Sequence, residues 1–178
     1  MKLKKRLALL LVAVMISTLM PTIGFAEEMA ALDGSKTAPV FTDMPNNWST
    51  AALQNAVDNG LLKGDNGRLR PGDSLTRAEM ASIINRAFGA TAEAALTGYQ
   101  DVSEKSWYYE EMGKALQMGT FQGGGDGLLR PQDPITRQEV FVVVARAFKL
   151  NNGSNANQNG FADQAKISSW AMSAAAAL

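Results

Sequence analysis

One short segment occurs twice in this sequence and constrains the fold more than any other feature. It reads Leu75-Thr76-Arg77-Ala78-Glu79 first and Ile135-Thr136-Arg137-Gln138-Glu139 60 residues later. Thr followed three residues on by Glu is the capping-box pattern, in which the hydroxyl and the carboxylate each accept a hydrogen bond from a free N–H at the helix start. Each copy therefore predicts a helix start, with Thr76 and Glu79, and Thr136 and Glu139, as the capping residues.

Apolar side chains follow each capping box at i, i+3, i+4, i+7 and i+8, the spacing of one helix face. Both stretches therefore predict amphipathic helices that face a core, and the fold class that we predict is all-α. The apolar positions are Met80, Ile83, Ile84, Ala87 and Phe88 in the first stretch, and Val140, Val143, Val144, Ala147 and Phe148 in the second.

Capping does not explain the two arginines of the segment. Arg77 and Arg137 occupy the first helical position, where the helix dipole disfavours a cation by roughly 0.3 to 1 kcal/mol. Two interpretations are open. The arginine forms an internal ion pair or hydrogen bonds to loop carbonyls, or it binds an external carboxylate or phosphate together with the helix N-terminus.

The segment belongs to a longer repeat whose parts recur at offsets of 58 to 60 residues. Two helices in about 50 residues cannot bury a good core alone, so we expect the units to pack on one another. A partial third unit opens at Phe161-Ala162-Asp163, contains Trp170 and has no third Thr-Arg-x-Glu segment. The matching parts are Phe41-Thr42-Asp43 with Tyr99-Gln100-Asp101, Trp48 with Trp107, Gly60 with Gly119, Gly64 with Gly123, and Leu69-Arg70-Pro71 with Leu129-Arg130-Pro131.

The predicted organisation begins with a cleaved secretory signal peptide at residues 1–26. A basic start, an apolar run from Leu7 to Met20 and the small residues Gly24 and Ala26 support it. That apolar run is short for a membrane span, and no second run follows it, so no span is expected in the mature form. The other predicted parts are a flexible lead-in at 27–39, unit one at 40–90, a linker at 91–98, unit two at 99–149, a polar linker at 150–160 and a partial unit three at 161–178.

Composition excludes several classes of function. The signal peptide carries four of the 17 Lys and Arg residues, so the mature chain keeps 13 against 17 Asp and Glu, a net charge near −4. Nucleic acid is therefore a poor candidate partner, because a phosphate backbone needs a basic surface. The chain has no Cys and no His, which removes disulfides, Ser-His-Asp catalysis and His-based zinc sites.

Two further expectations concern apolar residues. We expect Trp48, Trp107 and Trp170 to be buried at helix starts, with stacking on a sugar as the alternative. We expect the stretch from Ala174 to Leu178 to leave an apolar helix face exposed, because the third unit is incomplete, and such a face would favour self-association.

In their order, these parts closely resemble the S-layer homology (SLH) repeat of bacterial surface proteins. The resemblance covers the chain from about residue 40 to its end. It implies repeated helix-loop-helix units in a pseudo-threefold trefoil, here partial, whose grooves bind secondary cell-wall polymers, often pyruvylated anionic glycans attached to peptidoglycan. It therefore implies a secreted, non-catalytic carbohydrate-binding protein that is held on the cell wall.

The resemblance also implies a set of glycan-binding residues. The arginine of the family's Thr-Arg-Ala-Glu motif is associated with the glycan, and this role carries over to Arg77 and Arg137. Asp43, Asp101, Gly64 and Gly123 are secondary candidates, for which turn formation is the alternative. Trp48 and Trp107 complete the set as possible stacking residues. Gln138 departs from the motif's Ala, at a position that we expect to be exposed.

Other functions compete with that of a cell-wall anchor. A glycosidase would need two carboxylates across a cleft, from Asp101, Glu104, Glu110 and Glu111, and the two helical glutamates are expected on a solvated face. Calcium binding would use Asp65-Asn66-Gly67 or Gly125-Asp126-Gly127, neither of which supplies an EF-hand ligand pattern. A structural role in surface-layer assembly, or a truncated anchor of a larger exported enzyme, also stays open. We expect no metal or cofactor.

Overall fold

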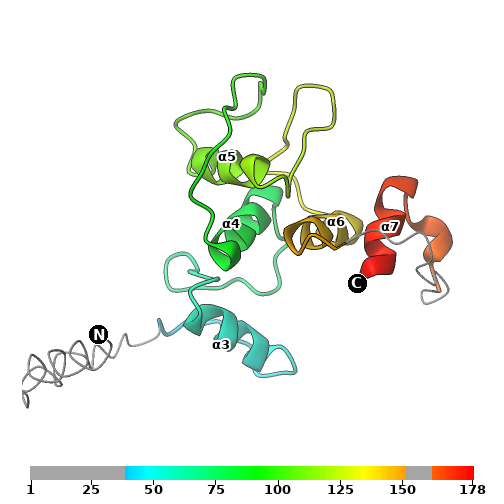
Figure 1. The fold of residues 1–178 in the computed structure, drawn as a ribbon. Coiled ribbons are helices and arrows are strands. Elements are labelled where there is room, and N and C mark those ends of the chain that lie inside the picture. The colour runs from blue at the N-terminus through cyan, green and yellow to red at the C-terminus, as the bar shows by residue number, and fades with distance from the viewer. Residues whose placement is uncertain (1–38, 151–161) are drawn as a thin grey trace, which may run out of the picture. The chain divides into compact units, whose positions relative to one another are not determined.

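The computed structural model describes residues 39–150 and 162–178. The predicted signal peptide, the lead-in up to residue 38 and the polar linker from residue 151 lie outside the described residues, as does Phe161. The described ranges form five α-helices and one 3-10 helix, with isolated bridges and no β-strand, which confirms the all-α fold class (Figure 1). The helices are α3 (Thr50–Asp58), α4 (Arg77–Phe88), α5 (Tyr109–Gln117), α6 (Arg137–Ala147), the 3-10 helix η1 (Gln164–Lys166) and α7 (Ser169–Ala177).

Both Thr-Arg-x-Glu segments start a helix through a capping box. At α4, Glu79 N donates to Thr76 Oγ1 at 3.2 Å, and Thr76 N donates to Glu79 Oε2 at 2.8 Å. The α6 start has the same pair of bonds between Thr136 and Glu139, at 3.4 and 2.8 Å. Local sequence thus determines where these two helices begin, because each cap satisfies N–H groups that have no partner within the helix.

In units two and three, the first helix packs on the second helix of the preceding unit. Helix α5 packs on α4, and α7 packs on α6. One core cluster joins units one and two, and a smaller cluster joins α6 to α7. The expected packing of units on one another is therefore present, while the pseudo-threefold trefoil stays a prediction. The larger cluster includes Met80, Ile84, Met112, Phe121, Leu129 and Val143, and the smaller one includes Val142, Ala145, Ala171 and Ala174.

The predicted core face is wrong at the C-terminal ends of α4 and α6, where Ala87, Phe88 and Phe148 are exposed. Phe88 is 40% exposed and Phe148 is 63% exposed. The two rings meet edge to face, with their centres 5.2 Å apart. The buried faces of α4 and α6 are turned towards α5 and α7, the helices that pack on them. Asn85, for example, is 3% exposed and donates through Nδ2 to Glu111 O at 2.8 Å.

The expected burial of the tryptophans is also wrong. Trp48 is 92% exposed, Trp107 63% and Trp170 54%. In unit two the neighbouring Tyr108 takes the core position, at 6% exposure, and Trp107 contacts its ring edge to face at 5.5 Å. Since a neighbour fills the core, the indole of Trp107 is left at the surface.

The stretch after Ala174 does not present the exposed apolar face that we expected. Ala174 is 6% exposed and Ala175 5%, because α7 packs on α6, and only Leu178 is largely exposed. Gln138, expected to be exposed, is half-buried, and its Oε1 accepts from Ser168 N at 3.0 Å. The departure from the motif's Ala therefore helps to hold the start of α7 on α6.

Candidate functional site

The start of α4 is docked on the loop of unit two. Arg77 N donates to Asp133 O at 3.0 Å and Ala78 N donates to Pro131 O at 2.8 Å. In the other direction Ile135 N donates to Leu75 O at 2.8 Å. The free amides of the helix start are therefore satisfied by the next repeat rather than by water, which fixes the register between the two units.

Arg77 ties the same junction together through its side chain. Its Nε donates to Leu129 O at 2.9 Å, and its Nη1 donates to Glu139 Oε1 at 2.5 Å. The guanidinium also lies 5.4 Å from the ring centre of Phe121, and the side chain is only 14% exposed. The internal ion pair that the sequence left open is present, and it joins the arginine of one repeat to the capping glutamate of the next.

Glu139 accepts hydrogen bonds from Arg77 and from both the backbone and the hydroxyl of Thr136 at this junction. Burial alone would raise its pKa, but hydrogen bonds from Thr136 and the charge and hydrogen bond of Arg77 outweigh burial and lower the pKa of Glu139. The folded protein therefore favours the charged form of the Glu139 carboxylate.

Arg137 has a different environment from Arg77, although the two residues correspond. Its side chain is exposed, and its guanidinium lies 5.5 Å from the ring centre of Phe141. Within residues 39–150 and 162–178 no carboxylate lies at ion-pair distance from it. The same motif position therefore gives a buried bridge in unit one and an exposed cation in unit two.

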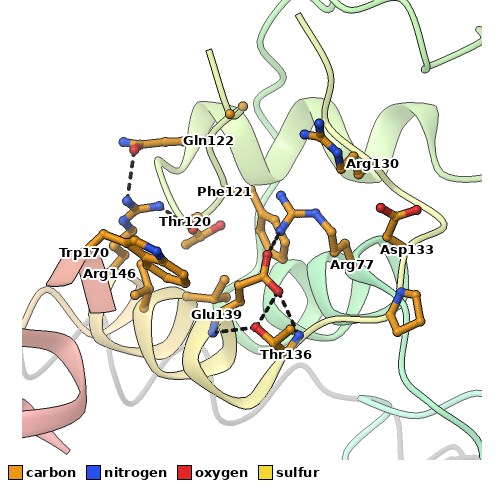
Figure 2. A pocket seen from close by; sticks show the side chains of 15 residues that line it. Arg77, Thr120, Phe121, Gln122, Arg130, Asp133, Thr136, Glu139, Arg146 and Trp170 are labelled. Carbon is orange, nitrogen blue, oxygen red and sulfur yellow. Dashed lines mark hydrogen bonds and ion pairs between the residues drawn. The ribbon is translucent and has the colours of Figure 1, made fainter. Parts of the chain in front are cut away.

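Two similar grooves follow the two long helices. The groove along α6, called here the α6 groove, has a volume of about 720 Å³, and the groove along α4, the α4 groove, about 580 Å³. Figure 2 shows the α6 groove with Arg77 and Glu139 in its middle and Trp170 at one end. Its lining is Arg77, Thr120–Gly124, Arg130, Asp133, Pro134, Thr136, Glu139, Val142, Val143, Arg146 and Trp170, and that of the α4 groove is Leu62–Asp65, Arg68, Leu69, Arg70, Leu75, Glu79, Ser82, Ile83, Arg86 and Trp107.

The two grooves are built from corresponding residues. Each combines the loop and second helix of one unit with the tryptophan of the next unit, Trp107 in the α4 groove and Trp170 in the α6 groove. Two of the three exposed tryptophans, Trp107 and Trp170, are thus groove walls, whereas Trp48 lines neither groove. The α6 groove also receives Arg77 from the preceding unit, so residues of three successive units line it.

Asp43 and Asp101 hold the groove loops and do not line either groove. Asp43 accepts from Leu69 N and Arg70 N, both at 2.8 Å, and Asp101 accepts from the corresponding Leu129 N and Arg130 N at 3.0 and 2.6 Å. Arg70 and Arg130 each have a φ of 52°, in the left-handed region that non-glycine residues rarely adopt. Each aspartate thus stabilises a strained loop conformation just before the proline.

Replacing Asp43 by Asn is expected to lower the melting temperature at neutral pH and to weaken its dependence on acid. The N–H of Leu69 is the main cause that lowers the pKa of Asp43, helped by Arg70 N–H and Arg68 and opposed by burial. A lowered folded-state pKa stabilises the fold above the unfolded value of about 3.8, and this stabilisation is lost as the pH falls through the folded pKa.

Thermal melts of the wild type and Asp43→Asn between neutral and acidic pH would measure this effect. The exposed Asp58, which accepts from Gln54 Nε2, offers the matched variant Asp58→Asn. Equal melting temperatures of the wild type and Asp43→Asn at pH 7 would contradict the prediction.

Gly64 and Gly123 line the grooves. Both positions need glycine, because the loops pass close to an aromatic ring there. A Cβ on Gly64 would lie 2.3 Å from Phe41 Cε1 and 2.7 Å from Arg68 O. A Cβ on Gly123 would lie 2.7 Å from Tyr99 Cε1. In both units the first aromatic residue of the repeat therefore packs against its glycine, which accounts for the recurrence of both residues.

The structure brings together only part of the predicted glycan-binding set. Arg77 and Gly123 line the α6 groove, and Gly64 and Trp107 line the α4 groove, whereas Arg137, Asp43, Asp101 and Trp48 line neither. Sequence reasoning missed Arg86 and Arg146 as groove residues, and it named Trp170 only through the alternative of stacking on a sugar. The first two occupy the same place in both repeats, 60 residues apart, and that recurrence was a signal that could have found them.

No metal-binding cluster and no membrane-spanning helix occur in the part of the chain that the structure describes. This part contains no group of three His, Cys, Asp or Glu residues that could hold a metal ion. It also contains no helix with the length and apolar character of a membrane span.

Comparison with known families matches this repeat directly. The S-layer homology domain profile matches residues 40–81 and 98–141. Residues 40–81 and 98–141 are S-layer homology domains. The two matched ranges contain both Thr-Arg-x-Glu segments and both groove loops, whereas the groove residues Arg86, Arg146 and Trp170 lie outside them.

Several larger proteins are similar to this chain. It is 30% identical over 156 residues to the surface-layer 125 kDa protein of Lysinibacillus sphaericus, covering 83% of this chain and 13% of that protein. It is 27% identical over 140 residues to the exoglucanase XynX of Acetivibrio thermocellus, covering 76% and 13%. It is 30% identical over 121 residues to the S-layer protein sap of Bacillus anthracis, covering 65% and 14%. The chain thus spans only about one seventh of the length of these relatives.

Proposed function

We propose that this chain is a non-catalytic anchor that holds a protein on the bacterial cell surface by binding an anionic cell-wall glycan in its grooves. The observation that carries the proposal is the repeated groove, in which arginine side chains lie together with one exposed tryptophan. An indole face packs well against the apolar face of a sugar ring, and a guanidinium can hold a carboxylate with two parallel hydrogen bonds.

The relatives support an anchor rather than an enzyme. A surface-layer protein and an exoglucanase have different overall roles, yet both share with this chain a part that covers only 13% of their length. A part that is common to proteins of such different chemistry suits attachment better than catalysis. S-layer homology domains are modules that hold proteins at the cell surface, and the predicted signal peptide provides the export that this location requires.

The glycosidase alternative finds little support in the candidate carboxylates. Both oxygens of Asp101 accept from backbone N–H groups. Glu110 and Glu111 lie 3.6 and 3.7 Å from Lys114 Nζ, and neither residue lines the α4 or the α6 groove. These carboxylates are therefore engaged in holding loops and helix surfaces.

The polymer that we propose is a secondary cell-wall polysaccharide linked to peptidoglycan, with pyruvate ketals as its anionic groups. A pyruvate ketal presents one carboxylate on a rigid sugar, which matches a groove that offers a guanidinium beside an aromatic wall. Binding would need no metal ion, so EDTA is expected to leave it unchanged.

Co-sedimentation with purified bacterial cell-wall sacculi tests the proposal. The chain is expected to sediment with intact sacculi and to remain in solution after the non-peptidoglycan polymer has been stripped chemically. The double variant Trp107→Ala, Trp170→Ala is expected to bind roughly 5- to 150-fold more weakly, since the polymer engages both grooves and each stacked aromatic ring contributes roughly 0.5 to 1.5 kcal/mol.

Trp48→Ala is the matched control, because Trp48 is 92% exposed and lines neither groove. It is expected to bind like the wild type. Failure of the wild type to sediment with intact sacculi would refute the anchor. Unchanged binding of the double variant would refute the grooves as the binding site.

A further inference from the structure

Arg146 lies in the last turn of α6, lines the α6 groove and donates to two uncharged groups. Its Nη1 donates to Thr120 O at 3.4 Å, and its Nη2 donates to Gln122 Oε1 at 2.9 Å (Figure 2). Burial lowers the pKa of this guanidinium, which nevertheless stays charged at any physiological pH. Among the residues that the structure describes, no carboxylate lies at ion-pair distance from Arg146.

The other two arginines of the α6 groove are neutralised by carboxylates. Arg77 is paired with Glu139 at 2.5 Å, and Arg130 is paired with Asp126. Arg146 is exposed in the groove and has no carboxylate partner among the described residues, so its guanidinium is free to pair with an incoming anion. The uncompensated positive charge of this groove therefore lies at Arg146.

A corresponding arginine lies in the α4 groove, where Lys63 takes the place of Gln122. Arg86 lies in the last turn of α4, and its Nη1 donates to Leu61 O at 2.9 Å. No carboxylate of the described ranges lies at ion-pair distance from it either. Each of the two arginines shares its groove with the tryptophan of the next unit, Arg146 with Trp170 and Arg86 with Trp107.

The hydrogen bonds to the loops leave each guanidinium with spare donors. A guanidinium has five N–H donors in a planar fork, and the bonds described here use two of them in Arg146 and one in Arg86. The remaining edge can therefore receive a carboxylate while the loop contacts keep the side chain in place.

We propose that Arg146 and Arg86 are the residues that bind the carboxylate of an anionic sugar in the two grooves, while Trp170 and Trp107 stack on its ring. This inference rests on the proposed function and names the charged contact of the same site. It gives the Thr-Arg-x-Glu arginine of unit one a different role, since Arg77 joins the two repeats through Glu139.

Isothermal titration calorimetry with a defined probe tests the inference. The probe is a methyl hexopyranoside that carries a 4,6-linked pyruvate ketal, and its methyl ester is the uncharged control of the same shape. The wild type is expected to bind the acid and to bind the ester at least about tenfold more weakly. The variant Arg86→Gln, Arg146→Gln is expected to bind the acid roughly 10- to 100-fold more weakly, and no better than the ester, because it loses a charge-assisted hydrogen bond in each groove.

Two further variants keep the test decisive. Lys166→Gln removes one positive charge from an exposed position of η1 that lines neither groove, and it is expected to bind like the wild type. Arg86→Lys, Arg146→Lys retains the charge without the planar fork, and it is expected to lose only part of the affinity. This variant decides the question if the glutamine variant proves to be unfolded by circular dichroism.

The outcomes separate this inference from the proposed function. A folded glutamine variant that binds the acid like the wild type would overturn the roles of Arg146 and Arg86 and leave the anchor intact. Wild-type sedimentation with sacculi together with equal affinities for acid and ester would also overturn the charged contact alone. Failure of the wild type to bind either sacculi or the acid would refute the proposed function itself.

Discussion

Glu139→Ala is expected to lower the free energy of unfolding by about 2 to 4 kcal/mol, the largest effect of any single polar substitution proposed for this chain. The variant loses a helix cap, which costs about 1 kcal/mol, and leaves the nearly buried guanidinium of Arg77 without its counter-charge. Urea denaturation followed by circular dichroism would measure the loss.

Glu79→Ala is the matched control, because Glu79 caps α4 in the same way. Its ion-pair partner Arg70 is half exposed at a distance of 3.4 Å, so the substitution is expected to cost only about 1 kcal/mol. Equal losses in the two variants would show that the Arg77 to Glu139 contact contributes no stability beyond capping.

The same contact predicts a dependence on acid. The folded-state pKa of Glu139 lies below its ordinary value of 4.5, so its contribution to stability is present above that value and is lost as the pH falls through the folded pKa. Glu139→Ala should therefore lose less stability than the wild type when the pH is lowered from 7 to about 3.

Gly64→Ala is the second substitution with a large expected effect, a loss of about 2 to 5 kcal/mol in the free energy of unfolding. The new methyl group would lie 2.3 Å from Phe41 Cε1 and 2.7 Å from the carbonyl oxygen of Arg68, at a backbone φ of +63°. Neither neighbour can move without opening the loop. The cost therefore combines overpacking of about 1 to 3 kcal/mol with left-handed strain of about 1 to 2 kcal/mol.

Gly60→Ala separates the two contributions. Gly60 also has a positive φ, of +69°, but a Cβ there would meet no atom within 4 Å. This control is therefore expected to lose only the strain of about 1 to 2 kcal/mol. If Gly64→Ala proved no less stable than Gly60→Ala, the close approach of Phe41 to the loop would not be a constraint on the fold.

Several features of this protein could be predicted from the sequence because short-range physics determines them. The two capping boxes placed the starts of α4 and α6, since a Thr and a Glu three residues apart can satisfy the free amides without help from the rest of the chain. Gly89, which follows the last residue of α4, adopts a left-handed conformation with a φ of 63°, as glycines at helix C-termini commonly do. The repeat itself was visible as recurring residues at nearly constant spacing.

The direction in which a helix faces was less predictable. The spacing of Phe88 and Phe148 suggests burial, yet α5 and α7 cover a neighbouring face and leave both rings exposed. Periodicity identifies an apolar stripe, but the position of the packed partner decides how far round the helix the buried face extends.

The sequence by itself determined the starts of α4 and α6 and the all-α character, because both depend on contacts between residues a few positions apart. Only the tertiary structure decided what the repeated residues do. It placed Arg77 against Glu139 of the next unit, left Arg137 exposed, and set Arg86 and Arg146 beside the tryptophan of the following repeat. The environment of a charged side chain depends on groups from distant parts of the chain, and identical motifs therefore acquire different roles when their neighbours differ.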